Sequence, residues 1–312
     1  MTLIKNSVLM LLVLMLSSCN LGHREADDTL SPIIMMTGTP RPEQPARSLL
    51  DPALASLPAF ALPSETVANI QAIYESGQAI GNQAGVFSKV GDSMTVSRSF
   101  LYAFGVDNYD LAGHSYLQTI IDGYSETNTR GGTAFTADSL AAGEGWIGSS
   151  VFNPSIASPA CNPNEPPLLC EYRIMRPSVA IIMFGTNDSG YRSDTQYRED
   201  IHAIVTFTEN AGIIPLLTTM PNRPDVAERV LAMNEILREI ASERNLPIID
   251  LYALTINLPN YGLTFDDVHL STPPAGLSGT ATFTDANLQY GYTVRNLATL
   301  QALAVLQALI DD

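Results

Sequence analysis

The chain has 312 residues, which is enough for one substantial α/β domain or two small ones with a sizeable hydrophobic core. Its composition, 46% hydrophobic and 15% charged with no low-complexity run or internal repeat, is ordinary for a globular protein. The formal net charge of −16 repels phosphate backbones, so the composition argues against nucleic acid as a partner.

Residues 1–18 have the pattern of an export signal. Lys5 supplies a positive start, and the short apolar run of residues 8–16 is followed by Ser17-Ser18-Cys19. This run is shorter than the roughly 20 apolar residues of a membrane-spanning helix, and no later segment is expected to span a bilayer. Leu16-Ser17-Ser18-Cys19 resembles a bacterial lipobox, which predicts cleavage before a lipidated Cys19. The alternative is an ordinary secretory signal followed by an incidental cysteine.

The lipobox predicts an extracytoplasmic protein that acyl chains on Cys19 hold at the membrane of the cell envelope. Each buried methylene of such a chain contributes about 0.8 kcal/mol to membrane binding. Residues 19–62 are rich in Pro, Ser, Thr and Ala without hydrophobic periodicity, so we expect them to form a flexible tether. Residues 63–312 are then the folded domain.

Two further cysteines, Cys161 and Cys170, lie in the proline-rich stretch CNPNEPPLLC. In an exported protein they are predicted to form a disulfide on a surface loop, worth roughly 2–3 kcal/mol. The alternative is a metal site, but two cysteines with no nearby histidine supply only half the ligands of a zinc centre. No metal is therefore expected.

Apolar and amphipathic segments alternate through the predicted domain. Short apolar runs at 85–90 and 247–251 and longer ones at 178–184 and 213–219 are typical of buried strands. Helical patterns lie at 67–81, 114–122, 194–210 and 225–245, and an amphipathic helix is expected to close the chain at 288–310. Strands separated by helices of this length predict right-handed βαβ units and a parallel sheet covered on both faces.

Short polar motifs directly follow two of the predicted strands. Gly91-Asp92-Ser93 follows the first strand, and Gly185-Thr186-Asn187-Asp188 follows the most apolar one. Functional groups of an open parallel sheet collect at the carboxyl ends of its strands, and glycine lets the backbone turn sharply there. Asp92 and Asp188 are expected to be structural and to accept backbone N–H bonds in these turns. Ser93 would begin the next helix, where free N–H groups favour developing negative charge.

A serine nucleophile needs a base, and one of the four histidines stands out. His269 lies in a loop before the final helix, three residues after Asp266, and this spacing in a tight turn can bring carboxylate and imidazole together. Asp267 is a second candidate for the carboxylate. The other histidines lie in the tether or on predicted helices: His23, His114 and His202.

In this order the three motifs resemble three of the four sequence blocks of the GDSL/SGNH hydrolase superfamily, over roughly residues 80 to 280. The resemblance implies a three-layer α/β/α sandwich around a parallel, flavodoxin-like sheet of about five strands. It implies Ser93 as the nucleophile, His269 as the general base and Asp266 as the group that orients the base. It also implies that the side chain of Asn187 and the backbone N–H of Ser93 stabilise an oxyanion.

The remaining block is a glycine whose N–H completes the oxyanion hole, and it has no clear counterpart. Residues 141–146 (AAGEGW) are the expected place. Gly145 is selected because an apolar helical stretch can start after it, and Gly143 stays open as an alternative. The sequence has no dinucleotide fingerprint, no HExxH and no phosphate-binding loop, so no cofactor is expected.

The predicted activity is hydrolysis of carboxylic esters through an acyl-enzyme on Ser93. The fold does not choose among lipid, aryl and acetylated-sugar esters, although a cell-surface location favours an exported polysaccharide. Two alternatives remain open: a non-catalytic surface module that binds glycan or protein on the same fold, and an acyltransferase that uses the same triad.

We predict that Cys19 is the lipidated N-terminus of the mature protein, because small residues precede it at the end of the apolar run. Membrane fractionation should find the wild-type chain with the membranes and the Cys19→Ala variant released from them. Mass spectrometry of the mature chain should detect the lipid. A Cys19→Ala protein that stays firmly in the membrane fraction contradicts the prediction.

Overall fold

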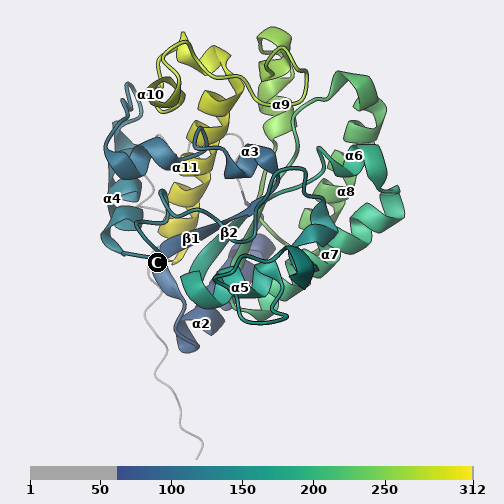
Figure 1. The fold of residues 1–312 in the computed structure, drawn as a ribbon. Helices are drawn as coiled ribbons and strands as arrows, with labels where there is room; N and C mark the ends of the chain where they lie inside the picture. The colour runs from purple at the N-terminus through teal and green to yellow at the C-terminus, as the bar shows by residue number, and fades with distance from the viewer. Residues whose placement is uncertain (1–61, 311–312) are drawn as a thin grey trace, which may run out of the picture. The chain divides into compact units, whose positions relative to one another are not determined.

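The structure is a computed structural model that describes residues 62–310, which form a parallel sheet with helices on both faces (Figure 1). Neighbouring strands lie in chain order: β1 (Gln83–Gly91), β2 (Pro177–Met183), β3 (Ile214–Thr218) and β4 (Ile248–Ile249). The predicted signal, Cys19 and all of the predicted tether except residue 62 lie outside the described residues.

Helices cover the sheet in two layers, as right-handed crossovers between parallel strands require. One layer contains α2 (Ser64–Ala79), α4 (Gln118–Glu126) and α11 (Gly291–Ile310), and the other contains α5 (Pro167–Met175), α7 (Asp194–Asn210) and α8 (Ala227–Glu243). Every residue of β2 and β3 is buried, which explains why these strands are continuous apolar runs in the sequence. The three-layer α/β/α architecture is therefore confirmed.

A fifth strand position is occupied at one residue only. A parallel bridge pairs Gly91 with Ala142, with hydrogen bonds of 3.2 Å from Gly91 N–H to the Ala141 carbonyl and from Gly143 N–H to the Gly91 carbonyl. Since β2 occupies the other edge of β1, this segment extends the sheet beyond β1. After β1 the chain first adds this segment on one side of β1 and then adds β2 on the other side, as in a flavodoxin-like sheet. The point where the strand order switches sides in this way is where such folds bind ligands.

Short helices gather where the strands end. They are α3 (Ser93–Val96), α6 (Asp188–Tyr191), α9 (Leu251–Thr255) and α10 (Leu277–Thr280), at the upper end of the view in Figure 1. The 3-10 turns are η2 (Tyr102–Val106), η3 (Ser115–Leu117), η4 (Gly148–Phe152), η5 (Pro154–Ile156), η6 (Pro224–Val226), η7 (Pro259–Gly262) and η8 (Asn287–Gln289).

Several predicted elements differ from the observed ones at their ends. The strand expected at 247–251 has only two residues, because Asp250 caps α9 by accepting the N–H of Ala253. Helix α5 has no counterpart among the predicted elements. It begins at a pair of prolines, Pro166 and Pro167, where helices tolerate the missing N–H.

The predicted closing helix is present as α11, which begins at Gly291, but it is buried along most of its length, so only its predicted amphipathic character is wrong. It packs against α2, α4 and α9. Within residues 62–310 it is the one helix long and apolar enough to cross a membrane, but over half of it is buried inside the protein, as in a core helix. Its polar residues Arg295 and Asn296 are also buried.

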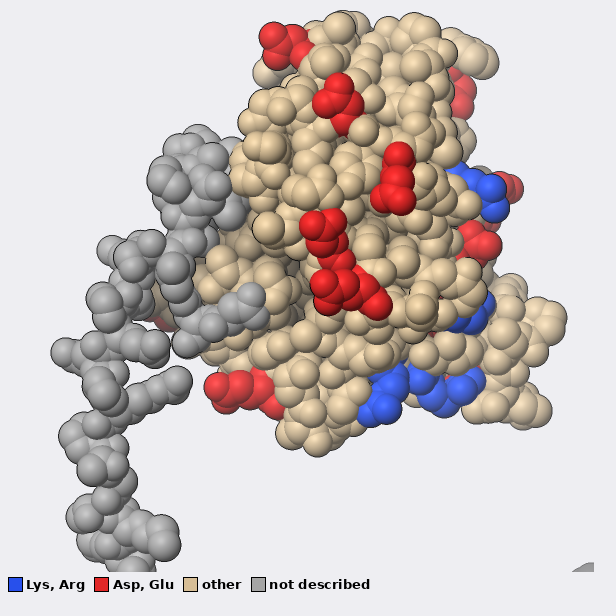
Figure 2. All heavy atoms as spheres, turned by 90° about the vertical axis from the view of Figure 1, so that its left-hand side faces the viewer, with Lys and Arg blue, Asp and Glu red and all other residues tan. Residues whose placement is uncertain are grey.

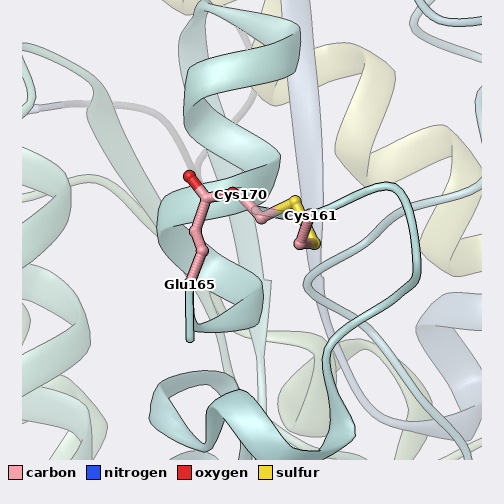
Figure 3. A group of neighbouring side chains, drawn as sticks. All are labelled: Cys161, Glu165 and Cys170. Atoms are coloured by element: carbon pink, nitrogen blue, oxygen red, sulfur yellow. A yellow bond between two sulfur atoms is a disulfide. The ribbon is translucent and has the colours of Figure 1, made fainter. Parts of the chain in front are cut away.

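Cys161 and Cys170 form the predicted disulfide (Figure 3). Cys161 lies in a loop and is partly exposed, but Cys170 lies in α5 and is fully buried, so only one end of the bridge lies on a surface loop as expected. Glu165 lies beside the sulfurs, but both of its carboxylate oxygens accept hydrogen bonds of 2.7 Å from Arg173, which lowers its pKa to about 2. The sulfurs are covalently joined, so proximity alone does not make this group a metal site.

The surface charge is mainly acidic. On the side of the molecule in Figure 2, Asp and Glu are spread from the top to the bottom of the face, and Lys and Arg lie along its lower edge and at its right. The described residues contain a single lysine, Lys89, and it is buried, so arginines supply the basic surface groups there.

Candidate active site

Ser93 lies in the tight turn that follows β1. A Cβ at Gly91 would lie 2.5 Å from the carbonyl oxygen of Met183 in β2, so no side chain fits there. The side chain of Asp92 then caps α3 by accepting the backbone N–H of Met94 at 3.0 Å. These two constraints bring Ser93 out of the sheet as the first residue of α3, half-buried at the switch point.

The predicted nucleophile, base and carboxylate lie in hydrogen-bond contact. Ser93 Oγ is 3.0 Å from His269 Nε2, and His269 Nδ1 is 2.8 Å from Asp266 Oδ2. Because the ionised carboxylate accepts a hydrogen from Nδ1, Nε2 is left with the lone pair that faces the serine hydroxyl. This chain of bonds joins residues 176 positions apart in the sequence.

Asp266 is held in the turn that carries the histidine. Its Oδ1 accepts the backbone N–H groups of Val268 and His269 at 2.9 Å each and the hydroxyl of Thr264 at 2.6 Å. Burial alone would raise the pKa of Asp266, but hydrogen bonds from Thr264, His269 and Val268 outweigh it and lower that pKa well below its usual range. The carboxylate therefore stays ionised at neutral pH.

Asp267, the other candidate carboxylate, does not contact the imidazole. It adopts the left-handed conformation (φ 57°), and its Oδ1 accepts a hydrogen bond of 3.1 Å from Asn260. The geometry thus assigns the position beside His269 to Asp266.

Asn187 lies in the turn after β2. Gly185 begins this turn at φ 132°, and a Cβ there would lie 2.1 Å from the terminal methyl of Met220. The amide of Asn187 donates to the carbonyl of Trp146 at 3.0 Å, which fixes its orientation and leaves its second hydrogen for a ligand.

The two candidate glycines differ in what their N–H groups do. Gly143 N–H donates to the carbonyl of Gly91, and the indole of Trp146 packs against Gly143, where a Cβ would lie 2.3 Å from the ring. In the described part of the chain, the N–H groups of Gly145 and Ser93 donate to no carbonyl or side chain, and both residues line the same cavity. These contacts favour Gly145 as the oxyanion donor.

An open cavity of about 730 Å³ surrounds these groups. No lysine or arginine lines the cavity. Apart from His269, the one ionisable side chain among its charged residue types is the exposed carboxylate of Glu144. Most of the other lining groups are small or hydroxyl-bearing. The lining consists of Ser93, Val96, Ser97, Ser99, Glu144, Gly145, Asn187, Val268, His269, Thr272 and Tyr292.

Asp92 accepts a backbone N–H bond within its own turn, from Met94, as predicted, whereas the bond of 2.9 Å to Asp188 comes from Gly148 in the distant turn η4. Their full burial was not anticipated. Desolvation raises the pKa of each to about 6, although the Arg295 charge lowers that of Asp92 and the Gly148 bond that of Asp188. Two buried carboxylates therefore lie one residue from Ser93 and one from Asn187.

Two residues of α11 reach the site without any local motif to mark them. Tyr292 lines the cavity, and Arg295 contacts the turn after Ser93. Their partners lie about two hundred positions earlier in the chain, so no spacing rule relates them to the serine motif.

A model of the GDSL-like lipase/acylhydrolase family matches residues 90–273, more than half of the chain. Three solved structures illustrate the similarity. A GDSL-like lipase from Bacteroides thetaiotaomicron is 13% identical, with 76% of this chain and 98% of that chain covered and a TM-score of 0.41. A lipase/acylhydrolase from Enterococcus faecalis is 17% identical (68% and 95% covered, TM-score 0.41), and an acetylxylan esterase from Geobacillus stearothermophilus is 16% identical (71% and 95% covered, TM-score 0.44). No curated protein matches the chain.

Replacing the two adjacent carboxylates one at a time should separate their roles. We expect Asp266→Asn to slow the labelling of Ser93 by a fluorophosphonate by on the order of 10² to 10⁴, because the imidazole loses its oriented tautomer. Asp267→Asn serves as the matched control and should label at close to the wild-type rate. Peptide mass mapping of the labelled serine measures both. If Asp267→Asn slowed the labelling of Ser93 more than Asp266→Asn did, Asp267 and not Asp266 would be the carboxylate that orients His269.

Proposed function

The chain belongs to the GDSL-like lipase/acylhydrolase family, and we propose that it is a serine esterase that hydrolyses carboxylic esters through an acyl-enzyme on Ser93. One observation carries the proposal: Asp266, His269 and Ser93 form an unbroken chain of hydrogen bonds that ends in an open cavity. A serine activated in this way is a nucleophile suited to acyl transfer.

In the first half-reaction, Ser93 Oγ attacks the ester carbonyl carbon while His269 Nε2 takes the hydroxyl proton. The imidazolium that forms keeps its hydrogen bond to ionised Asp266, which stabilises the new positive charge. When the tetrahedral intermediate collapses, the bond from the carbonyl carbon to the alcohol oxygen breaks. His269 returns the proton to the leaving alcohol, and the acyl group remains on Ser93.

The negative charge of the tetrahedral intermediate needs hydrogen-bond donors. The backbone N–H groups of Ser93 and Gly145 and the second amide hydrogen of Asn187 are the three donors proposed for it. One such donor contributes roughly 3–4 kcal/mol of transition-state stabilisation. The Trp146 carbonyl holds the Asn187 amide in place before substrate binds, so little reorganisation is needed.

Deacylation repeats these steps with water as the nucleophile. His269 takes a proton from water as the water oxygen bonds to the acyl carbon, and the bond to Ser93 Oγ then breaks as the serine regains its proton. The products are the free acid and an enzyme ready for another cycle.

The cavity lining favours neutral esters with polar groups. It contains hydroxyl side chains such as Ser97, Ser99 and Thr272 and the exposed carboxylate of Glu144, and no basic residue that would attract an anionic substrate. We therefore propose short-chain esters of polar alcohols as the substrate class, including O-acetyl groups of polysaccharide, ahead of lipid esters with long apolar chains.

Ser93→Ala should abolish both ester hydrolysis and fluorophosphonate labelling. A domain of residues 62–312 would be assayed with aryl acetates and with a serine-directed fluorophosphonate. Loss of a triad member lowers the turnover number by on the order of 10⁴ to 10⁶. A loss of this size can be measured even when a contaminating esterase contributes some background activity.

Ser278→Ala, on the short helix α10, is the control because its hydroxyl bonds only within its own turn. It should retain the wild-type rate. A folded wild-type domain that neither takes the label nor hydrolyses any tested ester contradicts the proposal and favours a binding module on the same fold. Transfer of the acyl group to an added sugar in preference to water would instead identify an acyltransferase.

A further inference from the structure

Arg295 is a buried guanidinium directly behind the nucleophile turn. It lies on α11 and is 1% exposed. Burying a charged group is unfavourable unless its partners replace the lost water, so its contacts should explain why an arginine is placed there.

The contacts of Arg295 converge on the residues that follow Ser93. Nη1 donates to the Met94 carbonyl at 2.8 Å, and Nη2 donates to the hydroxyl of Thr95 at 3.1 Å. The guanidinium carbon lies 3.7 Å from the centre of the Phe100 ring, which shields it from solvent. One side chain from the end of the chain thus holds two consecutive residues of α3.

A second group from α11 supports the same carbonyl. The hydroxyl of Tyr292, one turn earlier on the helix, donates to Met94 O at 3.2 Å. The Met94 carbonyl is therefore held from two sides, while the Met94 N–H is held by Asp92. The peptide groups on both sides of Met94 are fixed, and with them the orientation of the neighbouring Ser93.

Arg295 also affects the charge behind the site. Burial raises the pKa of Asp92 to about 6, and the positive charge of Arg295 is the largest effect that opposes this rise. His269 opposes it as well. The other ionisable groups that interact with Asp92 are Asp188, Tyr197 and Tyr292. Arg295 is therefore the buried cation that offsets the charge of Asp92, the residue beside Ser93.

We propose that Arg295 is a positioning residue of the active site, which holds the Ser93 turn through Met94 and Thr95 and balances the charge of Asp92. This inference rests on the proposed function, since it gives Arg295 a part in the reaction of Ser93. The competing interpretation is that Arg295 only anchors α11 to the core. An anchor would affect stability but leave the turnover of each folded molecule unchanged.

The experiment compares Arg295→Met, Arg295→Lys and a control, Thr299→Val, in the full-length chain. Thr299 is the matched control because it lies one turn further along α11, is equally buried and bonds only to the carbonyl of Arg295 within the helix. Thermal unfolding gives the folded fraction of each variant. Hydrolysis of an aryl acetate gives kcat and KM between pH 5 and 9, and fluorophosphonate labelling gives the reactivity of Ser93.

For Arg295→Met we expect kcat per folded molecule to fall by on the order of tenfold to a hundredfold with little change in KM, because a small misplacement of a reacting group has this cost. The acid limb of the kcat profile should move to higher pH. Without the positive charge the pKa of Asp92 rises further, and a protonated Asp92 accepts the Met94 N–H less strongly.

Arg295→Lys should separate the two roles. Lysine keeps the charge, so the acid limb should return to its wild-type position. It lacks the planar pair of donors, so kcat should stay below that of wild type. Thr299→Val should match wild type in kcat and in pH profile.

A wild-type kcat in Arg295→Lys overturns the positioning role, whether or not the methionine variant folds. So does an equal loss of kcat in Arg295→Met and Thr299→Val. Either result would be obtained while the wild-type enzyme is active, so it would leave the proposed function intact. A wild-type protein that neither labels on Ser93 nor hydrolyses ester removes the proposed function and this inference together.

Discussion

The close approach of backbone around Gly91 is the constraint on which the rest of the site depends. A Cβ there would lie 2.4 Å from the Thr95 hydroxyl and 2.5 Å from the Met183 carbonyl, while both backbone polar groups of Gly91 pair with the segment 141–143. Three chain segments therefore end side by side at the switch point of the sheet. The residues that follow them are Ser93, Asn187 and Gly145, the three sources of the proposed oxyanion donors.

The turns that create this arrangement also bring negative charge under it. Asp92 caps α3 where the chain leaves β1, and Asp188, in the turn after β2, accepts the backbone N–H of Gly148 near the third segment. Burial raises the pKa of both to about 6. A developing oxyanion would be disfavoured by two uncompensated carboxylates. Arg295 offsets the charge of Asp92 and donates hydrogen bonds to Met94 and Thr95, so α11 is linked directly to the turn that carries Ser93.

Features that depend on local rules could be predicted from the sequence. The run at 178–184 indicated a strand buried on both faces, and the turn at 266–269 brings its carboxylate and imidazole together over three residues. The choice between Gly143 and Gly145 stayed open because it depends on a strand pairing between distant segments. Arg295 could not be found because its partners lie 201 and 200 positions away, and a helix buried on nearly every side has no polar face to indicate its role.

In the proposed reaction the acyl group is bound covalently to Ser93 before water releases it. Rapid acid quenching within the first turnover of an aryl acetate, followed by peptide mass mapping, detects such an intermediate. We expect an acetyl group on the peptide that contains Ser93, formed no more slowly than the alcohol is released. Release of the alcohol with no acetyl group on Ser93, or with the acetyl group on another residue, would contradict the proposed reaction.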